Sequence, residues 1–380
     1  MDLRLKQRIS LSIYFFFSGF CFSTWASRIP TIKTFFDLNE AELGSILIAM
    51  PISSLIGLPI SGWLVSKYDS RVPLLFSFIL FSISLVLIGN ATSVFALVIA
   101  IGIFSFCMRI LNIAMNTQSI TLQKKYEKRM IGSFHGIWST GGLSGVGFST
   151  LMVKMNIGIS QHLLYVAIIT FFATTLSYWF LVKNDRSATG NKLIIGKPDK
   201  FILYLGVLVF FAAVCEGGMY DWSGVYFKEV IGEDIFTYGY LIFMTVMAIS
   251  RFFSDGIIDR IGMEKTYIIS ACFVSIGIGM AVLFPTFWMA MAGFCLVGFG
   301  VSSVFPMTFA LAGTSKKYSP GMAISLITTY GIAGMLIGPP LIGYLAHAFN
   351  LQISFITFII SGLLLIPFSQ LFFKLQKKLE

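Results

Sequence analysis

The feature that most constrains this chain is the regular recurrence of apolar segments long enough to cross a lipid bilayer. A membrane-spanning helix needs roughly 20 predominantly apolar residues, and short connections rich in turn-forming or charged residues separate the segments here. The pattern predicts six spans in each half of the chain. They cover residues 9–30, 41–65, 72–90, 94–122, 129–153 and 161–182, then 199–227, 236–258, 266–284, 287–314, 319–346 and 351–373.

Composition supports the same interpretation. Charged residues make up only 12% of the chain and hydrophobic residues 56%, whereas an ordinary soluble domain carries roughly 25% charged residues. So few charges cannot cover the surface of a water-soluble fold. We therefore expect an all-α membrane protein whose twelve helices form two pseudo-symmetric six-helix bundles.

Lysine and arginine are distributed unevenly among the connections. If the N-terminus is cytoplasmic, 21 of the 27 lie in inner segments, whereas the outer segments hold only Lys33, Lys154 and Lys228. Short cytoplasmic loops retain positive charge, so both termini are expected to be cytoplasmic. The net charge of +10 then reflects membrane topology, and no nucleic-acid partner is expected.

An internal repeat occurs at about half the chain length. The connections at residues 62–71 and 255–265 share glycine, aspartate and basic residues, and aligning Ser66 with Asp259 gives an offset of 193 residues. Repeats of this kind, with a binding site at their interface, are typical of secondary transporters. The longest connection separates the two copies.

These boundaries predict three parts. We expect an N-terminal six-helix bundle over residues 1–182, a cytoplasmic linker over residues 183–200 and a C-terminal six-helix bundle over residues 201–380.

The second copy of the repeated loop also carries a family resemblance. With Asp259, Arg260 and Gly262 in place, residues 259–265 resemble the cytoplasmic signature of the major facilitator superfamily, although Ser66 stands in the first copy where an acid is usual. The resemblance implies a twelve-helix carrier that works by alternating access, with its first, fourth, seventh and tenth spans lining a central cavity. It implies neither an enzyme nor a cofactor.

Four further stretches resemble the YbjJ-like branch of bacterial inner-membrane carriers, which implies a multi-pass protein of the bacterial inner membrane. They are Ser27–Pro30, Met115–Gln118, Ser133–Gly142 and Glu216–Ser223.

Charged residues in and around the two repeated loops are predicted to act in gating or in structure. Arg251 and Asp255 are spaced for an ion pair one helical turn apart. The complete set is Lys67, Arg71, Arg251, Asp255, Asp259 and Arg260.

The fourth predicted span carries a polar stripe. Arg109, Asn112 and Asn116 lie at i, i+3 and i+7, which places them on one face of a helix. An arginine within the bilayer needs a partner, and its guanidinium suits a carboxylate or phosphate on a substrate. The alternative is a structural ion pair or hydrogen bonds to backbone carbonyls.

The seventh predicted span carries an acid near its middle. Glu216 has Tyr220 and Ser223 on its face at i+4 and i+7, and Gly217 and Gly218 follow it directly. The two glycines suggest a helix that is broken or exposed to water at this point.

Two roles for Glu216 remain open at this stage. A carboxylate between a low-dielectric interior and an alternating aqueous path can take up a proton, which would make Glu216 the proton-coupling site. The alternative is a permanent salt bridge with Arg109 or Arg251.

The first and tenth predicted spans carry aromatic and small polar residues on one face. Tyr14 and Trp25 recur with this spacing in the first span, and Phe299 and Ser302 in the tenth. We interpret these four, with Tyr220 and the stripe of Arg109, Asn112 and Asn116, as substrate-binding residues. Ordinary helix packing is the alternative for each aromatic residue.

Together these observations predict a secondary transporter for a small polar, carboxylate-bearing organic solute, namely an organic acid, a sugar acid or a carboxylate-type siderophore. We expect proton-coupled import by a monomer in the lipid bilayer, with no metal site. An efflux carrier of the same family is the alternative, and a polytopic membrane enzyme or a transport-inactive sensor is the alternative of another class.

Overall fold

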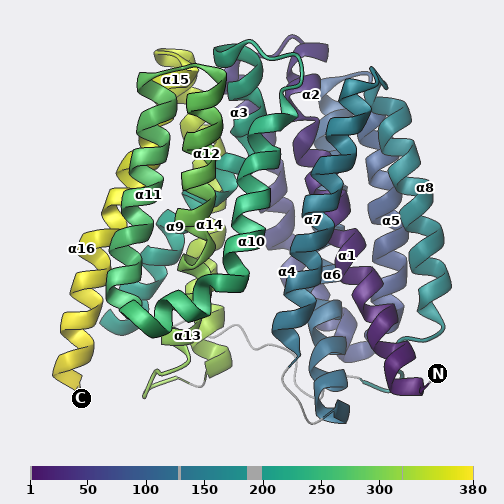
Figure 1. Cartoon of the computed structure of the whole chain (residues 1–380). Coiled ribbons are helices and arrows are strands. Elements are labelled where there is room, and N and C mark those ends of the chain that lie inside the picture. Colours follow the sequence, from purple (N-terminus) through teal and green to yellow (C-terminus); the bar gives the residue numbers. More distant parts are fainter. Residues whose placement is uncertain (1, 127–129, 186–198, 319, 380) are drawn as a thin grey trace. The chain divides into compact units, whose positions relative to one another are not determined.

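The computed structural model describes residues 2–126, 130–185, 199–318 and 320–379, and helices make up nearly all of these residues (Figure 1). Each of the twelve predicted spans coincides with one helix or with two consecutive helices, as the sequence predicted. The helices of the first half are α1 (Leu3–Ser27), α2 (Ile29–Phe35), α3 (Glu40–Leu47), α4 (Ala49–Lys67), α5 (Arg71–Gly89), α6 (Val94–Tyr126), α7 (Ile131–Lys154) and α8 (Ile159–Tyr178).

The second half begins with α9, which a π-helical segment, Phe227–Ile231, extends by five residues. The helices are α9 (Lys200–Tyr226), α10 (Thr237–Ile261), α11 (Met263–Leu283), α12 (Phe287–Ser302), α13 (Val304–Ala312), α14 (Pro320–Ala348), α15 (Leu351–Ser354) and α16 (Ile356–Leu379). The predicted linker, residues 183–200, falls largely outside the described residues.

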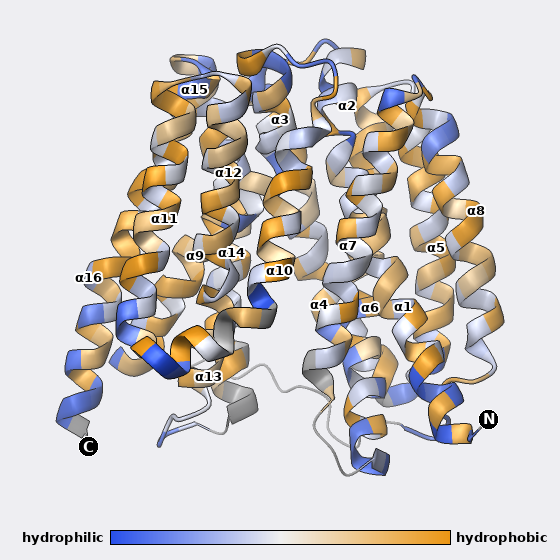
Figure 2. Cartoon of the chain, in the orientation of Figure 1, coloured by the Kyte–Doolittle hydropathy of each residue, from blue (hydrophilic) through white to orange (hydrophobic). Residues whose placement is uncertain are grey.

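Ten helical stretches within the described residues are long and apolar enough to cross a membrane. The helices are apolar along their middles and more polar toward their ends (Figure 2). The other two long helices, α7 and α10, have 24 and 25 residues. Their glycines and charged residues, Arg251 among them, lower their mean hydropathy.

Four of the spans are made of two consecutive helices, and in three of them a proline follows the break closely. These three breaks lie at Arg28, Ile48 and Ser303, and the fourth lies at Phe355 between α15 and α16. Proline is tolerated in the first turn of a helix, where its missing N–H group has no partner to lose. The prolines are Pro30, Pro51 and Pro306.

The chain divides into two compact units. The first consists of Met1–Ile32 and Ala49–Ile194, and the second of Lys33–Ile48 and Ile195–Glu380. The segment Lys33–Ile48, which includes α3, therefore belongs structurally to the second unit although it lies within the first half of the sequence. The sequence repeat did not indicate that this segment belongs to the second unit.

Close glycine contacts hold the helices of the first unit together. A Cβ atom on Gly141 of α7 would lie 1.9 Å from the carbonyl oxygen of Phe16 on α1, and one on Gly145 would lie 2.4 Å from that of Phe20. Small residues allow such close approach between membrane helices, so these glycines bring α1 and α7 together.

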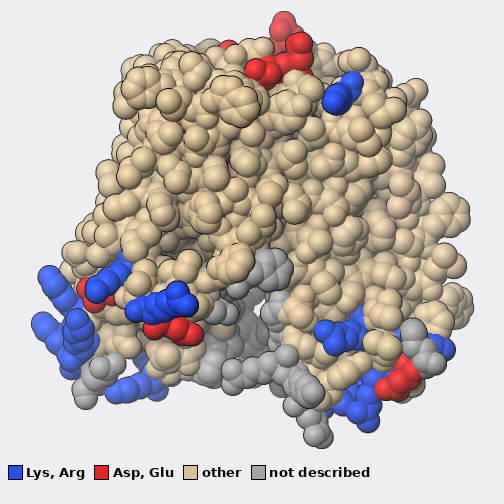
Figure 3. Space-filling view, in the orientation of Figure 1, with Lys and Arg blue, Asp and Glu red and all other residues tan. Residues whose placement is uncertain are grey.

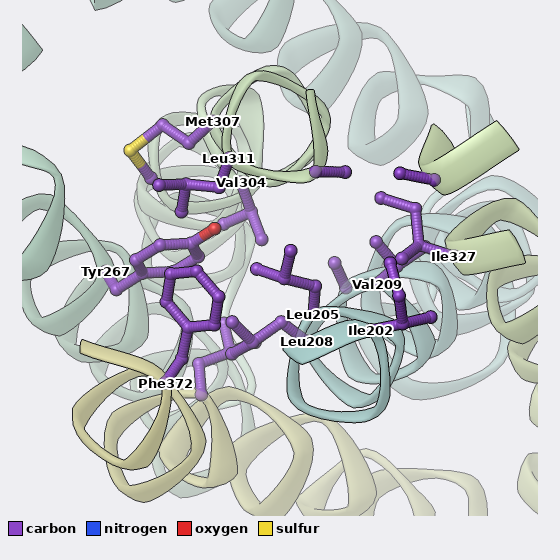
Figure 4. Close-up of a cluster of buried hydrophobic side chains, with 14 of the residues drawn as sticks. Ile202, Leu205, Leu208, Val209, Tyr267, Val304, Met307, Leu311, Ile327 and Phe372 are labelled. Carbon is purple, nitrogen blue, oxygen red and sulfur yellow. The ribbon is translucent and has the colours of Figure 1, made fainter. Parts of the chain in front are cut away.

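In the second unit, α9 packs along α14 and α16. Buried side chains from α9, α11, α13, α14 and α16 form a hydrophobic cluster (Figure 4). The cluster includes Leu205, Leu208, Tyr267 and Phe372, and the hydroxyl of Tyr267 lies 2.6 Å from that of Thr308. This cluster fixes the position of α9, which carries the acid in the middle of the span.

The sequence suggested a helix that is broken or exposed to water at Gly217 and Gly218, and of these two possibilities the break is wrong, because the helix continues through both residues. A Cβ atom on Gly218 would lie 2.3 Å from the ring of Phe358 on α16. The glycine is therefore needed for close packing against a neighbouring helix and does not interrupt the backbone.

Candidate transport site

The second unit contains a cluster of ionisable side chains within its membrane-spanning helices. Glu216 on α9 is 7% exposed, and its Oε1 atom accepts hydrogen bonds from the Tyr220 hydroxyl at 2.5 Å and from Arg251 Nη2 at 3.2 Å. The contact with Arg251 on α10 is an ion pair. Of the two partners that the sequence allowed for Glu216, Arg251 makes the contact.

Helix geometry explains why these residues meet. Glu216 and Tyr220 are one turn apart on α9, so their side chains lie on the same face. The ring of Tyr220 packs against Tyr240 and Phe243 of α10, with both centroid distances at 5.9 Å. These rings hold α9 against α10. Arg251 lies closer to the C-terminal end of α10 than these rings do, and its long side chain reaches Glu216.

The two carboxylate oxygens of Glu216 have different surroundings. Oε1 receives both hydrogen bonds, whereas Oε2 is buried and has no hydrogen-bond partner. Burial of an ionised carboxylate is costly unless it is paired, so Arg251 stabilises the ionised form. Oε2 is therefore the oxygen of this carboxylate that has no hydrogen bond to lose if a proton is added.

The first unit contains a cation in a different setting. Arg109 on α6 is half-buried, and its Nε atom donates a hydrogen bond of 2.8 Å to the Ser54 hydroxyl on α4. Among the described residues no ion pair is recorded for Arg109. Its guanidinium group has further donors that the neutral serine does not use.

The predicted polar stripe continues along α6 from Arg109. Asn112 is exposed in the unit, and the side-chain amide of Asn116 donates to the backbone and side-chain oxygens of Asn112 at 2.9 and 3.1 Å. Arg109, Asn112 and Asn116 therefore present several hydrogen-bonding groups along one side of α6, as the spacing predicted.

The four aromatic and small polar residues predicted from the first and tenth spans lie in other settings. The Tyr14 hydroxyl donates to the carbonyl of Thr174 at 2.8 Å, and Trp25, only 1% exposed, packs against Phe104. Phe299 is 45% exposed beside Phe273, and the hydroxyl of Ser302 donates to the carbonyl of Phe299. Within the described residues, Tyr14 and Trp25 form no hydrogen bond with Arg109, and Phe299 and Ser302 form none with Glu216.

The predicted gating residues are mostly exposed, as Asp259 and Arg260 are. Gly262 ends α10 with a positive φ of 82°, a backbone conformation that glycine adopts without strain. The side chain of Asp255 lies outside the described residues, so its predicted pairing with Arg251 stays a prediction.

In the first repeated loop, aromatic rings accompany the two basic residues. Lys67 Nζ lies over the ring of Trp63 at 4.7 Å, and the guanidinium of Arg71 lies over Tyr178 at 5.4 Å. Arg71 Nε is also 3.8 Å from a carboxylate oxygen of Asp69.

Sequence reasoning missed several partners of buried polar groups. Ser54, which holds Arg109, carried no distinguishing signal among the many serines of the spans. His162 was assigned no role, yet its Nδ1 atom accepts a hydrogen bond of 3.0 Å from the buried Arg28.

A second missed cluster surrounds the buried side chain of Asp185 near the end of the first unit. Asp185 accepts hydrogen bonds from the backbone N–H and hydroxyl of Ser70, and from the side-chain amide of Gln118. The carboxylate thereby satisfies the first N–H group at the start of α5. Within the described residues, no group of three or more His, Cys, Asp or Glu side chains could hold a metal ion.

Long apolar helices, close glycine contacts and ionisable groups buried at mid-span define a polytopic α-helical membrane protein. The chain matches the Major Facilitator Superfamily in two overlapping stretches, residues 11–312 and 242–380. The protein belongs to this superfamily and is accordingly a membrane transporter.

Individual relatives agree with this assignment. The chain is 28% identical over 353 residues to an uncharacterized MFS-type transporter of Yersinia pestis, covering 92% of each protein. It is also 28% identical over 350 residues to the membrane protein MosC of Rhizobium meliloti, covering 90% of this chain and 84% of MosC. The crystal structure of the D323A mutant of the nucleoside transporter NupG has a TM-score of 0.78 at 12% identity, covering 98% of this chain and all of NupG, which shows a shared fold.

Proposed function

We propose that the protein is a proton-coupled secondary carrier that imports a small polar organic solute bearing a carboxylate. The observation that carries the proposal is the buried pair of Glu216 and Arg251, with the Tyr220 hydroxyl on the same carboxylate oxygen. An ionisable pair within membrane-spanning helices is expensive to bury and typically marks an ion or proton pathway.

Protonation of Glu216 would change the charge of this cluster. The ionised carboxylate is held to Arg251, and a neutral carboxylic acid is held much less strongly because the Coulombic attraction is lost. One proton taken up at Oε2 therefore loosens the contact between α9 and α10, and its release restores the contact. Proton binding is in this way coupled to a structural change in the second unit.

The cargo class is inferred from Arg109. A guanidinium whose recorded side-chain partner is a neutral serine retains donors in the planar arrangement that suits a carboxylate. Asn112 and Asn116 add uncharged hydrogen-bonding groups beside it, which suits the hydroxyl groups of a sugar acid or hydroxy acid. A polar binding face of this kind favours a nutrient over a lipophilic drug, so import is proposed.

The protein is proposed to lie in the bacterial inner membrane, with both termini on the cytoplasmic side. In support, lysine and arginine side chains gather at the end of each unit where its chain terminus lies (Figure 3). Retention of positive charge on the cytoplasmic side accounts for such a distribution.

The test is uptake by purified protein in proteoliposomes, with and without an inward proton gradient, using a panel of radiolabelled organic and sugar acids. We expect gradient-dependent accumulation of at least one acid, loss of accumulation but retained exchange in Glu216→Gln, and loss of binding in Arg109→Ala. Matched controls are Asp234→Asn and Arg4→Gln, which change exposed charges. Accumulation by Glu216→Gln against a gradient would refute the coupling role, and cargo expelled by the gradient would reverse the direction.

A further inference from the structure

Two buried hydroxyl groups on α9 and α10 lack hydrogen-bond partners. Ser223 on α9 is 0% exposed and Thr237 at the start of α10 is 1% exposed, and neither side-chain oxygen has a partner. A hydroxyl inside a helix, as that of Ser223 is, ordinarily bonds to a carbonyl of the preceding turn, as Thr245 and Ser250 of α10 do. Thr237 is the first residue of α10 and has no preceding helical turn. Buried polar groups without protein partners are typically satisfied by ordered water.

The positions of these hydroxyls form a continuous series with Glu216. On α9, Glu216, Tyr220 and Ser223 occur at i, i+4 and i+7, which places them within about 60° of one another around the helix axis. The buried carboxylate oxygen Oε2 of Glu216, also without a partner, lies at one end of this series.

Contacts between the two helices place Thr237 at the other end. Arg251 meets Glu216, Tyr240 and Phe243 meet Tyr220, and the backbone of Gly239 lies against the ring of Phe227. Residues later in α9 therefore contact residues earlier in α10, so the two helices run antiparallel. By this register Ser223 lies at the level of Gly239 and Tyr240, and Thr237 lies one turn beyond.

We propose that the hydroxyls of Ser223 and Thr237 line a water-containing proton path that leads from the start of α10, past Tyr220, to Glu216. The inference rests on the proposed function, because it requires that Glu216 takes up a proton. Each hydroxyl and each water both donates and accepts a hydrogen bond, so a proton that enters at Thr237 is relayed by Ser223 and by water to Oε2, while the Tyr220 hydroxyl keeps its bond to Oε1. The carboxylate becomes a neutral acid, Arg251 keeps its charge, and no other reactant is needed.

The other groups around Glu216 are compatible with this assignment. The titratable or charged side chains near it are Cys215 and Tyr220 on α9, with Arg251 and Tyr240 on α10. From α14 and α16, the neighbouring glycines Gly217 and Gly218 meet the apolar side chains of Met335 and Phe358. The polar route to Glu216 therefore runs along the contact of α9 with α10.

The test needs no cargo. Infrared spectroscopy of protein in liposomes detects the carbonyl band of a protonated carboxylic acid, and its absence from Glu216→Gln would assign it to Glu216. After a change to heavy water, the exchange rate of this band measures access of water to the acid. We expect Ser223→Ala and Thr237→Val to slow this exchange about tenfold, since each removes one hydroxyl from the path.

The control variants distinguish loss of the proton path from a general loss of structure. Thr237→Ser keeps the hydroxyl and should exchange like the wild type, as should Thr245→Val and Ser250→Ala, whose hydroxyls bond within α10. A Glu216 band that exchanges at the wild-type rate in both Ser223→Ala and Thr237→Val would overturn the path alone. A band that persists unchanged in Glu216→Gln would instead overturn the proton-coupling role itself.

Discussion

The two units hold their buried cations in contrasting ways. In the first unit the recorded side-chain partner of Arg109 is the neutral Ser54, whereas in the second unit Arg251 forms an ion pair with Glu216. A cation held by a neutral group keeps its charge available to a ligand, whereas one held by a carboxylate responds to protonation of that carboxylate. The contrast supports the proposed division of roles, with ligand recognition in the first unit and proton coupling in the second.

The largest expected effect comes from breaking the ion pair of the second unit. Arg251→Gln leaves the Glu216 carboxylate buried without its cation and should lower the free energy of unfolding by about 3–5 kcal/mol. Denaturant unfolding in detergent measures this loss.

The control for this change is Arg260→Gln, which removes an exposed arginine from the same helix. In the double variant Glu216→Gln/Arg251→Gln most of the stability should return, because no unpaired charge remains. If Arg251→Gln and the double variant lower the free energy of unfolding equally, the conclusion that Arg251 offsets the buried charge of Glu216 is contradicted.

The next effect concerns Arg109. Arg109→Ala should weaken cargo binding by about 1.5–3 kcal/mol, the usual strength of a hydrogen bond to a charged group, while leaving stability nearly unchanged. Arg109→Lys should not restore binding, because lysine lacks the planar pair of donors. Thermal-shift titration with the cargo found by the uptake screen measures both, and a large loss of stability in Arg109→Ala would make Arg109 a structural cation like Arg251.

A third prediction compares how far close glycine contacts between helices stabilise the two units. Gly141→Ala would place a Cβ atom against the backbone of Phe16 and should destabilise the protein by about 1–3 kcal/mol. On the same helix, a Cβ atom on Gly136 meets nothing within 4 Å, so Gly136→Ala should be neutral or slightly stabilising. Thermal unfolding of the two variants, with Gly334→Ala of α14 as the equivalent in the second unit, checks whether both units depend on close glycine contacts.

The smallest effect is expected at Ser54. Ser54→Ala removes the hydrogen bond that orients Arg109 and should weaken cargo binding by about 0.5–1.5 kcal/mol. Ser61→Ala is the matched control on α4, because its hydroxyl bonds within the helix to the carbonyl of Leu58. An effect of Ser54→Ala as large as that of Arg109→Ala would mean that the serine itself contacts the cargo.

The sequence predicted the helices well because span length and hydropathy are local properties. The bond between Tyr220 and Glu216 was also predictable, since residues at i and i+4 share a helix face. The choice of Arg251 over Arg109 as the partner of Glu216 was not predictable, because sequence spacing does not say which helices adjoin. The same limit hid Ser54 and the bond between Arg28 and His162.

Aromatic residues show a second limit of sequence reasoning. Tyr14 lies on a helix face that also carries polar atoms, which suggested cargo contact, yet its hydroxyl bonds to the carbonyl of Thr174. A buried tyrosine requires a partner for its hydroxyl whether it binds cargo or packs against a helix. Glycine was equally ambiguous, since Gly218 could have marked either a break or a close packing contact.

The segment Lys33–Ile48 has a consequence for engineering the protein as separate halves. Lys33 of this segment forms ion pairs with Glu40 and with Glu229, at 3.1 and 2.6 Å. Gly44 of α3 lies against Gly343 of α14. A polypeptide that begins at residue 199 would lack this segment and would expose the surface of α14 that α3 covers. Co-expressed fragments should therefore be divided so that the first fragment carries residues 33–48 intact, and a second fragment made alone should aggregate unless a peptide spanning these residues is supplied.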